Sequence, residues 1–244
     1  MTAAVAPRGE LDATASIVAR RSGSSSVVDV RGDGVLSPRR SLAGVLLTAS
    51  TAGPLGGDRH RVEVVVGDEA TLRVGSVSSP VVLPGTGAAA RVAVDAEVGA
   101  GAVLRWTPEP TVVSEAARLI STASITVGPG ASVVWEERIV LGRSGEAAGS
   151  AELRLDVVGP DGALCRHGWR LGAGAAGWDG PGGLGGRRVL ASRLVVDAAV
   201  ASGPPRSIAH DGVVGGVWSH DGWSVVTVAA DEVTALDVAL AELT

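Results

Sequence analysis

Between residues 62 and 167, apolar and polar residues alternate in a pattern that recurs four times. Each copy has apolar residues at every second position, then a turn that contains glycine, then a second alternating stretch. The copies are VEVVVGDEATLRV (62–74), VDAEVGAGAVLRW (94–106), ASITVGPGASVVW (123–135) and, more loosely, LDVVGPDGALCRH (155–167). Their turn alanines, Ala70, Ala102, Ala131 and Ala163, are 32, 29 and 32 residues apart. Alternation with period two predicts strands, so each copy is expected to form two strands joined by a tight connection.

A single two-strand unit is marginal in water, but stacked units cover each other's apolar faces. We therefore predict an all-β fold in which strand-pair repeats stack into a β-helix-like, solenoidal sheet assembly. An Asp-Gly turn at 221–222 predicts a hairpin near the C-terminus. The other predicted strands are short and rich in valine: 26–31, 42–48, 188–196, 213–219 and 223–229.

The C-terminal segment departs from the strand pattern. Asp231 can cap a helix over about 231–243, in which Val233, Leu236, Leu240 and Leu243 form one apolar stripe. We favour packing of this stripe on the sheet, with docking of a partner as the alternative. Residues 113–120 fit one helical turn or an extended segment.

A glycine-rich segment, 172–186, contains eight glycines in fifteen residues and is predicted to be a mobile surface loop. Its first part, GAGAAG (172–177), matches the dinucleotide-binding pattern. The residues that follow include Pro181 and further glycines, so they cannot begin the helix that such a site needs.

Composition excludes several kinds of chemistry. The chain has no lysine, which rules out a Schiff-base enzyme, a pyridoxal-phosphate anchor and a Walker-type phosphate loop. The only cysteine, Cys165, cannot form an internal disulfide or a multi-cysteine metal site. The N-terminus lacks an export signal and no apolar stretch is long enough to span a membrane, so a cytoplasmic protein without membrane contact is predicted. A net charge of −5, with both signs interspersed, argues against non-specific nucleic-acid binding but leaves local basic patches open, and no nucleic-acid partner is predicted.

Cys165 and His167 lie two positions apart on a predicted strand and so share a face, an arrangement that could hold a metal ion. In the repeat alignment they take the places of Leu104 and Trp106, which favours an inward, packed environment instead. The other histidines each lie beside an aspartate and are interpreted as turn residues: His60, His210 and His220.

Three segments border the repeats: GPLGGDRHR (53–61), WTPEPTVV (106–113) and WEERIVLGRSGE (135–146). Trp106 and Trp135 hold equivalent repeat positions, so the residues after them are expected to leave the sheet at one edge. This would gather Glu109, Glu136 and Glu146 on one rim. Alternatively, the prolines of the second segment only end a strand and the acids are solvated. Spacing alone does not decide between the two.

In this order the three segments resemble the urease accessory protein D family, also called UreD or UreH. The family shows a Pro-Gly-Gly turn ending in Asp, a Leu-x-Trp-x-Pro run and a Trp-Glu run that ends in Gly-Arg-x-x-x-Gly-Glu. The matching residues are Pro54 to Asp58; Leu104, Trp106, Pro108, Pro110, Thr111 and Val112; and Trp135, Glu136, Leu141, Gly142, Arg143, Gly145 and Glu146. The family often carries Lys and Tyr in the segment matching 75–85, where this chain has neither, and loop 172–186 has no family counterpart.

The resemblance implies a single UreD-like domain over 1–244 and a protein that is not an enzyme. Such proteins form a scaffold with accessory proteins F and G, bind urease apoprotein and help to deliver nickel to its active site. No tightly bound cofactor is expected, only transient Ni²⁺. The implied nickel-path acids are Asp58, Glu109, Glu136 and Glu146. The implied partner-binding residues are Trp106, Pro108, Trp135, Arg143, Leu236 and Leu240.

The competing hypothesis is a β-solenoid or jelly-roll binding module for a carbohydrate or another small ligand. Sugar sites usually stack rings on exposed aromatic side chains, and only six tryptophans are available for this. The sequence therefore favours the urease accessory function.

Overall fold

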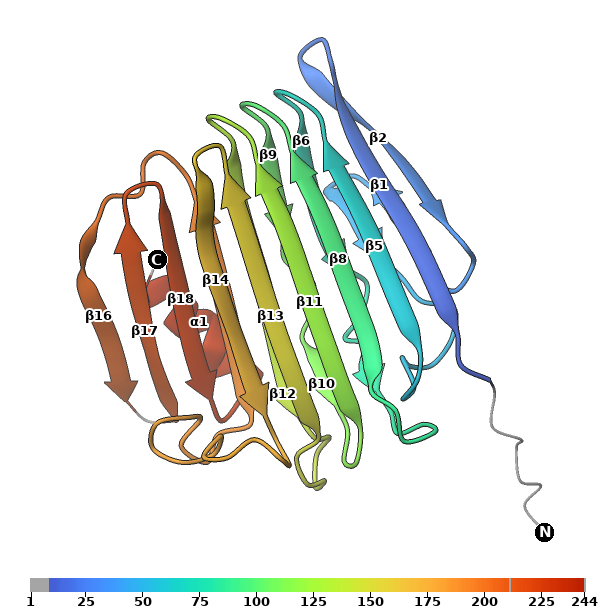
Figure 1. The fold of residues 1–244 in the computed structure, drawn as a ribbon, viewed down its shortest axis with the longest axis vertical. Coiled ribbons are helices and arrows are strands. Elements are labelled where there is room, and N and C mark those ends of the chain that lie inside the picture. Colours follow the sequence, from blue (N-terminus) through green and yellow to red (C-terminus); the bar gives the residue numbers. More distant parts are fainter. Residues whose placement is uncertain (1–8, 211, 244) are drawn as a thin grey trace.

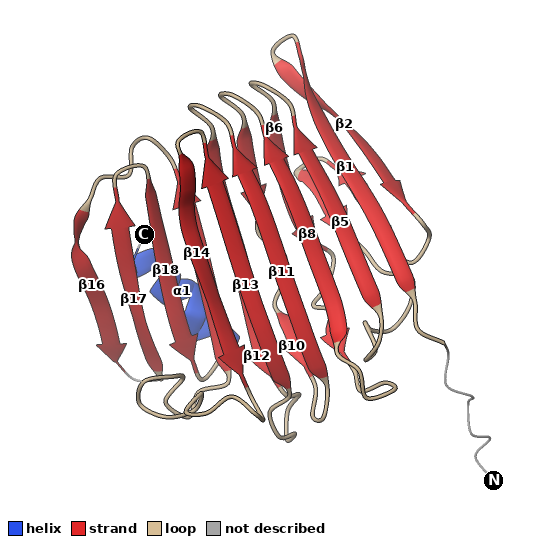
Figure 2. Cartoon of the chain, in the orientation of Figure 1, coloured by secondary structure: helices blue, strands red, loops and turns tan. Residues whose placement is uncertain are grey.

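Two facing β-sheets and one C-terminal helix make up the fold (Figures 1 and 2). The computed structural model describes residues 9–210 and 212–243. The elements are β1 (Asp12–Ser22), β2 (Ser25–Gly32), β3 (Arg39–Ser41), β4 (Gly44–Leu47), β5 (Arg59–Val66), β6 (Thr71–Ser76), β7 (Val81–Val82), β8 (Ala90–Val98), β9 (Val103–Trp106), β10 (Thr111–Val113), β11 (Arg118–Val127), β12 (Ser132–Leu141), β13 (Ser150–Gly159), β14 (Gly162–Leu171), β15 (Val189–Val196), β16 (Gly203–His210), β17 (Val213–His220), β18 (Trp223–Ala230) and α1 (Val233–Leu243).

The first sheet has the strand order β14-β13-β11-β8-β5-β1-β2. The second has the order β16-β17-β18-β15-β12-β9-β6-β4-β3, with β10 pairing with β12 and β7 pairing with β10. Successive repeats start in the first sheet and cross to the second: β5 to β6, β8 to β9 and β11 to β12. Equivalent strands pair in parallel, as β5 with β8 and β9 with β12. The predicted all-β solenoid is confirmed.

The apolar positions of the repeats form the core between the sheets. The turn alanines of the first three repeats, Ala70, Ala102 and Ala131, are buried, as the period-two pattern requires. Trp106 and Trp135 are direct partners in neighbouring parallel strands. Their rings stack with centroids 4.8 Å apart and planes 7° from parallel.

The fourth repeat does not follow the other three, and the expectation that it would is wrong. Its two arms, β13 and β14, stay in the first sheet as an antiparallel hairpin with an irregular register near Val157. Its turn alanine, Ala163, is exposed. The coil therefore ends at β13, because β14 turns back instead of crossing to the second sheet.

The C-terminal helix packs on the outer face of the second sheet, against β15, β17 and β18. Leu236 and Leu240 are fully buried there. Gly215 of β17 lies under the helix, where an added Cβ would approach Leu243 to 3.2 Å. Packing of the stripe on the sheet is confirmed, and the expectation that Leu236 and Leu240 bind a partner is wrong because the sheet already covers them. The predicted hairpin of β17 and β18 is also present.

The glycine-rich loop has its own internal hydrogen bonds. The Leu184 amide donates to the Trp178 carbonyl at 2.7 Å, and the Gly186 amide donates to the Asp179 carbonyl at 2.8 Å. Leu184 is fully buried in the core. The loop leads into strand β15 and not into a helix, which agrees with the exclusion of a dinucleotide site.

Residues 113–120 join β10 to β11 through a short turn and are mostly extended. Within the described chain, no helix is both long enough and apolar enough to cross a lipid bilayer.

Candidate functional site

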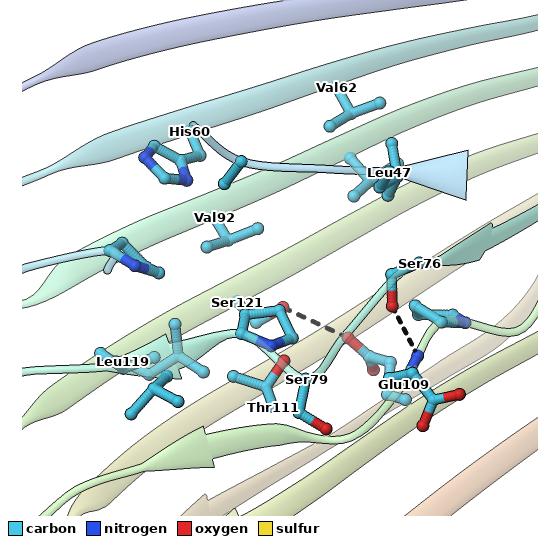
Figure 3. A pocket seen from close by; sticks show the side chains of 18 of the residues that line it. Leu47, His60, Val62, Ser76, Ser79, Val92, Glu109, Thr111, Leu119 and Ser121 are labelled. Carbon is cyan, nitrogen blue, oxygen red and sulfur yellow. Dashed lines mark hydrogen bonds between the residues drawn. The ribbon is translucent and has the colours of Figure 1, made fainter. Parts of the chain in front are cut away.

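A cavity of about 390 Å³ lies between the two sheets (Figure 3). Strands β5, β8 and β11 form one wall, and β12 with the connections around 48–54, 76–83 and 107–111 forms the other. Most of the lining is apolar, including Val62, Val92 and Leu119. The polar side chains on the lining include His60, Ser76, Glu109, Thr111, Ser121 and Glu137.

The cavity lies beside an interruption in the second sheet. Strand β12 pairs with β9 over Ser132–Trp135 and with β10 over Ile139–Leu141. Residues 107–110 connect β9 to β10 and leave the ladder between these two stretches. Pro108 and Pro110 have no amide hydrogen to donate to a neighbouring strand, which explains why the ladder breaks here. The prediction that 107–110 leaves the sheet is confirmed.

Glu137 is the acidic group that the fold places inside the cavity. Alternation along β12 turns Trp135, Glu137 and Ile139 inward. The Ser121 hydroxyl, from β11, donates a hydrogen bond to Glu137 Oε1 at 3.3 Å, drawn as a dashed line in Figure 3. Burial raises the pKa of the Glu137 carboxyl to about 7, and the Ser121 hydrogen bond opposes this only in part. A carboxyl with a strongly shifted pKa in a cavity marks a candidate functional site.

Of the sequence-predicted acids, Glu109 lies at this cavity and Asp58 lies in the turn before β5. Glu109 is exposed and lines the cavity, and its amide donates to the Ser76 hydroxyl at 2.9 Å. Asp58 is buried, and its carboxylate accepts hydrogen bonds from the amides of Leu11, at 2.9 Å, and Leu55, at 2.8 Å. Asp58 therefore fixes the turn that precedes β5.

The expected rim of Glu109, Glu136 and Glu146 does not form. Glu136 stays within β12 and points to the opposite face from Glu137, where it is buried in ion pairs with Arg138 and Arg193. Glu146 lies in the loop after β12. There hydrogen bonds from the Arg143 side chain and backbone lower the pKa of Glu146 to about 2. Both carboxylates are already held by cations or amides of this chain.

The tryptophans expected at a partner surface are instead part of the core. Trp106 and Trp135 are 5% and 1% exposed, so they cannot contact another protein without unfolding. Pro108 lines the cavity and is partly exposed, and Arg143 is exposed and paired with Glu146. These two remain accessible.

Cys165 and His167 share the inner side of β14 and are partly buried. Their equivalence with Leu104 and Trp106 would place them in the second sheet, but β14 belongs to the first. Trp169 Nε1 donates to His167 Nε2 at 3.0 Å. Burial lowers the pKa of His167 and raises that of Cys165, and the charge of Asp156 adds to the second effect. Among the described residues, no group of three or more His, Cys, Asp or Glu side chains is placed to hold a metal ion.

Comparison with known proteins identifies the family. The model of the UreD urease accessory protein family matches residues 13–244. The chain is 38% identical to the urease accessory protein UreD of Streptomyces avermitilis over 204 residues, which cover 80% of this chain and 81% of the relative. It is 35% identical to UreD of Streptomyces coelicolor, covering 81% of each chain, and 37% identical to UreD of Frankia alni, covering 78% of this chain and 70% of the relative. The chain belongs to the UreD family of urease accessory proteins.

In this UreD-family fold, the three segments that carry the resemblance meet at one place. The cavity lining includes Pro54 from the first segment, Trp106, Pro108 and Glu109 from the second, and Trp135 to Ile139 from the third. Segments far apart in the sequence thus surround the same space, and Glu137 is the acid at its inner wall. Counting inward positions from Trp135 would have found Glu137 from the sequence.

The raised pKa of Glu137 gives a prediction about stability. In the unfolded chain the group has a pKa near its ordinary value of 4.5, so between about pH 4.5 and pH 7 the folded protein binds more protons than the unfolded one. Stability therefore falls as the pH rises through this window. Glu137→Gln removes this loss. Because the Glu137 side chain is partly exposed, we expect the variant to gain only about 1–2 kcal/mol over the wild type between about pH 5 and about pH 8.

Urea unfolding of the wild type and E137Q at both pH values measures this difference. Glu97→Gln is the matched control, because Glu97 is exposed on the first sheet and should leave the pH dependence unchanged. Parallel pH profiles for wild type and E137Q would show that the Glu137 carboxyl titrates normally.

Proposed function

We propose that this protein is a non-catalytic maturation factor of urease. It acts in the cytoplasm, binds urease apoprotein together with accessory proteins F and G, and helps to deliver Ni²⁺ to the urease active site. Membership of the UreD family supports the maturation role. A carbohydrate-binding module is less well supported, since two of the six tryptophans, Trp106 and Trp135, are buried and cannot stack on a sugar ring.

The observation that carries the nickel part of the proposal is the cavity with Glu137 on its wall. A passage must admit a cation and also release it. Carboxylate and hydroxyl oxygens bind Ni²⁺ less tightly than thiolate or imidazole ligands do, so carboxylates set in a mostly apolar lining suit transfer better than storage. Glu109, exposed at the same cavity, supplies a second carboxylate toward solvent.

The experiment uses urease produced with all its accessory proteins in cells that lack this chain and receive it in trans. With limiting nickel, Glu137→Gln should lower the nickel content of purified urease about tenfold, equivalent to ~1.4 kcal/mol of lost cation stabilisation. Glu137→Asp, which keeps the charge, should restore much of it. Elemental analysis of the urease gives the readout, and E97Q is the control.

Co-purification separates the two parts of the proposal. Tagged wild type and E137Q should retain urease apoprotein and the F protein equally. Full nickel content with E137Q would remove the cavity from the nickel path. Failure of the wild type to retain urease, or unchanged urease activation without this chain, would refute the maturation role itself.

A further inference from the structure

The helix covers only part of the outer face of the second sheet. It packs against β15, β17 and β18, and it contacts β16. On strands β6 and β9 the outward positions are exposed, with Arg73 and Arg105 the largest side chains there. Strand β2 of the first sheet contacts β6 at its start, where the Thr71 amide donates to the Ser26 hydroxyl at 2.8 Å, but the Arg73 and Arg105 side chains stay exposed.

Strand register places arginines together on the uncovered part. Arg73 of β6 and Arg105 of β9 are direct partners in neighbouring parallel strands. Arg39 of β3 lies on the same face. It is the partner of Leu46 in β4, and Leu46 is the partner of Gly75 in β6, two residues after Arg73. We call Arg39, Arg73 and Arg105 the basic face. Like charges directly opposite each other destabilise a sheet, so this arrangement has a cost in the isolated chain.

Acidic side chains do not offset this charge. Strands β3, β4, β6 and β9 contain no Asp or Glu. In the described part of the chain, none of the three arginines of the basic face forms an ion pair, whereas Arg193 and Arg138, further along the same sheet, are held by Glu136.

The outer face of the first sheet shows the opposite arrangement. Its arginines alternate with acids, and many of them form ion pairs. The pairs are Arg59 with Asp12, Arg61 with Glu63 and Asp95, Arg154 and Arg166 with Asp156, and Arg170 with Glu152. The basic face is therefore a local excess of positive charge on a chain whose net charge is −5.

Aliphatic side chains lie among these arginines. Val103 of β9 is 38% exposed, and Leu46 and Val134 on the same face are partly exposed. Arginines mixed with exposed apolar groups are typical of protein–protein interfaces. Three arginines on an acidic chain are few for a nucleic-acid site, which needs an extended basic stripe.

We propose that the basic face docks an acidic surface of a partner protein. The partner's carboxylates would neutralise the adjacent guanidinium groups and pair with them at short range, while Val103, Leu46 and Val134 become covered. Such an interface associates faster and more tightly at low salt. The cavity lies between the two sheets and the basic face lies on the outer side of the second, so docking here does not require nickel to pass through the cavity. This inference therefore stands apart from the proposed function.

The test uses the purified full chain and a fluorescein-labelled poly-glutamate peptide as the acidic probe. Fluorescence anisotropy gives the Kd at about 50 mM and about 200 mM salt, concentrations that differ about twofold in screening length. Arg73→Glu with Arg105→Glu should weaken binding by about tenfold or more and reduce the salt dependence. Arg73→Gln with Arg105→Gln should have a smaller effect in the same direction, and circular dichroism checks that both fold.

The matched control is Arg91→Glu with Arg118→Glu, which makes the same change in net charge on the outer face of the first sheet. Binding should then remain within about twofold of the wild type. Equal losses in the two glutamate variants, or no binding by the wild type, would overturn the proposal. Tighter binding of single-stranded DNA than of the peptide would assign the face to nucleic acid. Dimerisation in gel filtration that is lost in R73E/R105E would assign it to a second copy of this chain.

Discussion

Replacing Glu136 with alanine is expected to lower the free energy of unfolding by about 3–5 kcal/mol. The Glu136 carboxylate accepts hydrogen bonds from Arg138 Nε at 2.9 Å and from Arg193 Nε at 2.7 Å, and its side chain is only 4% exposed. Arg138 also pairs with Asp237 of α1 at 3.0 Å. Removing the carboxylate leaves two largely buried guanidinium groups without their main counter-charge, and it weakens the connection between β12 and the helix.

Urea unfolding measures this loss. Glu152→Ala is the matched control, because Glu152 is about half exposed and its pair with Arg170 is 3.6 Å long. Such a surface pair is worth less than about 1 kcal/mol. A loss of under 1 kcal/mol for E136A would mean that solvent or Asp237 compensates both arginines. Because E136A perturbs the fold, Glu137 is the better residue for testing nickel transfer.

Replacing Trp135 with alanine is expected to cost about 3–5 kcal/mol. Trp135 is 1% exposed and stacks on Trp106, so its removal deletes a large apolar surface and the partner ring's main contact. The chain contains no Phe or Tyr, and its core side chains are mostly Val, Ala and Leu, which cannot expand to fill the space. Urea unfolding followed by far-ultraviolet circular dichroism gives the free energy.

Trp218→Ala serves as the comparison, since Trp218 is 52% exposed on β17 and its removal should cost under about 1 kcal/mol. Trp135→Leu should fall between the two, because it keeps apolar volume. Similar stabilities for W135A and W218A would contradict a core role for the stacked pair.

Much of the fold follows from local pattern. Ala70, Ala102 and Ala131 mark three turns of the coil, and the spacing between them gave the correct pairing of Trp106 with Trp135. Parallel stacking is what these repeats allow, because each unit can bury its apolar face only against the units beside it.

The fourth repeat shows where the pattern stops being informative. A strand–turn–strand unit has the same alternation whether it crosses to the other sheet or folds back as a hairpin. β14 folds back and pairs antiparallel with β13, and the alternation of its residues carries no sign of this choice. The strands β1 and β16 were not predicted for a different reason, which is a weak apolar signal. β1 buries mainly small residues such as Ala13 and Ala15, and β16 begins with Gly203, Pro204 and Pro205 and is largely exposed.

The site was predicted in outline and missed in detail. The three family segments do surround one cavity, but Glu137, next to the predicted Glu136, is the acid that enters it. Side chains of adjacent residues in a strand point to opposite faces, so an error of one position moves a carboxylate from one side of the sheet to the other. Trp135 is equivalent to the inward Trp106, so alternation from Trp135 turns Glu137 inward and Glu136 outward.

The parallel coil is closed at each end by a strand of reversed direction. β2 runs antiparallel to β1 and β14 to β13 in the first sheet, and β3 runs antiparallel to β4 and β15 to β12 in the second. A regular parallel stack would otherwise offer an edge that another molecule could extend indefinitely. The reversed strands break that continuity, so the number of turns in the coil is set within one chain and end-to-end growth into fibres is disfavoured.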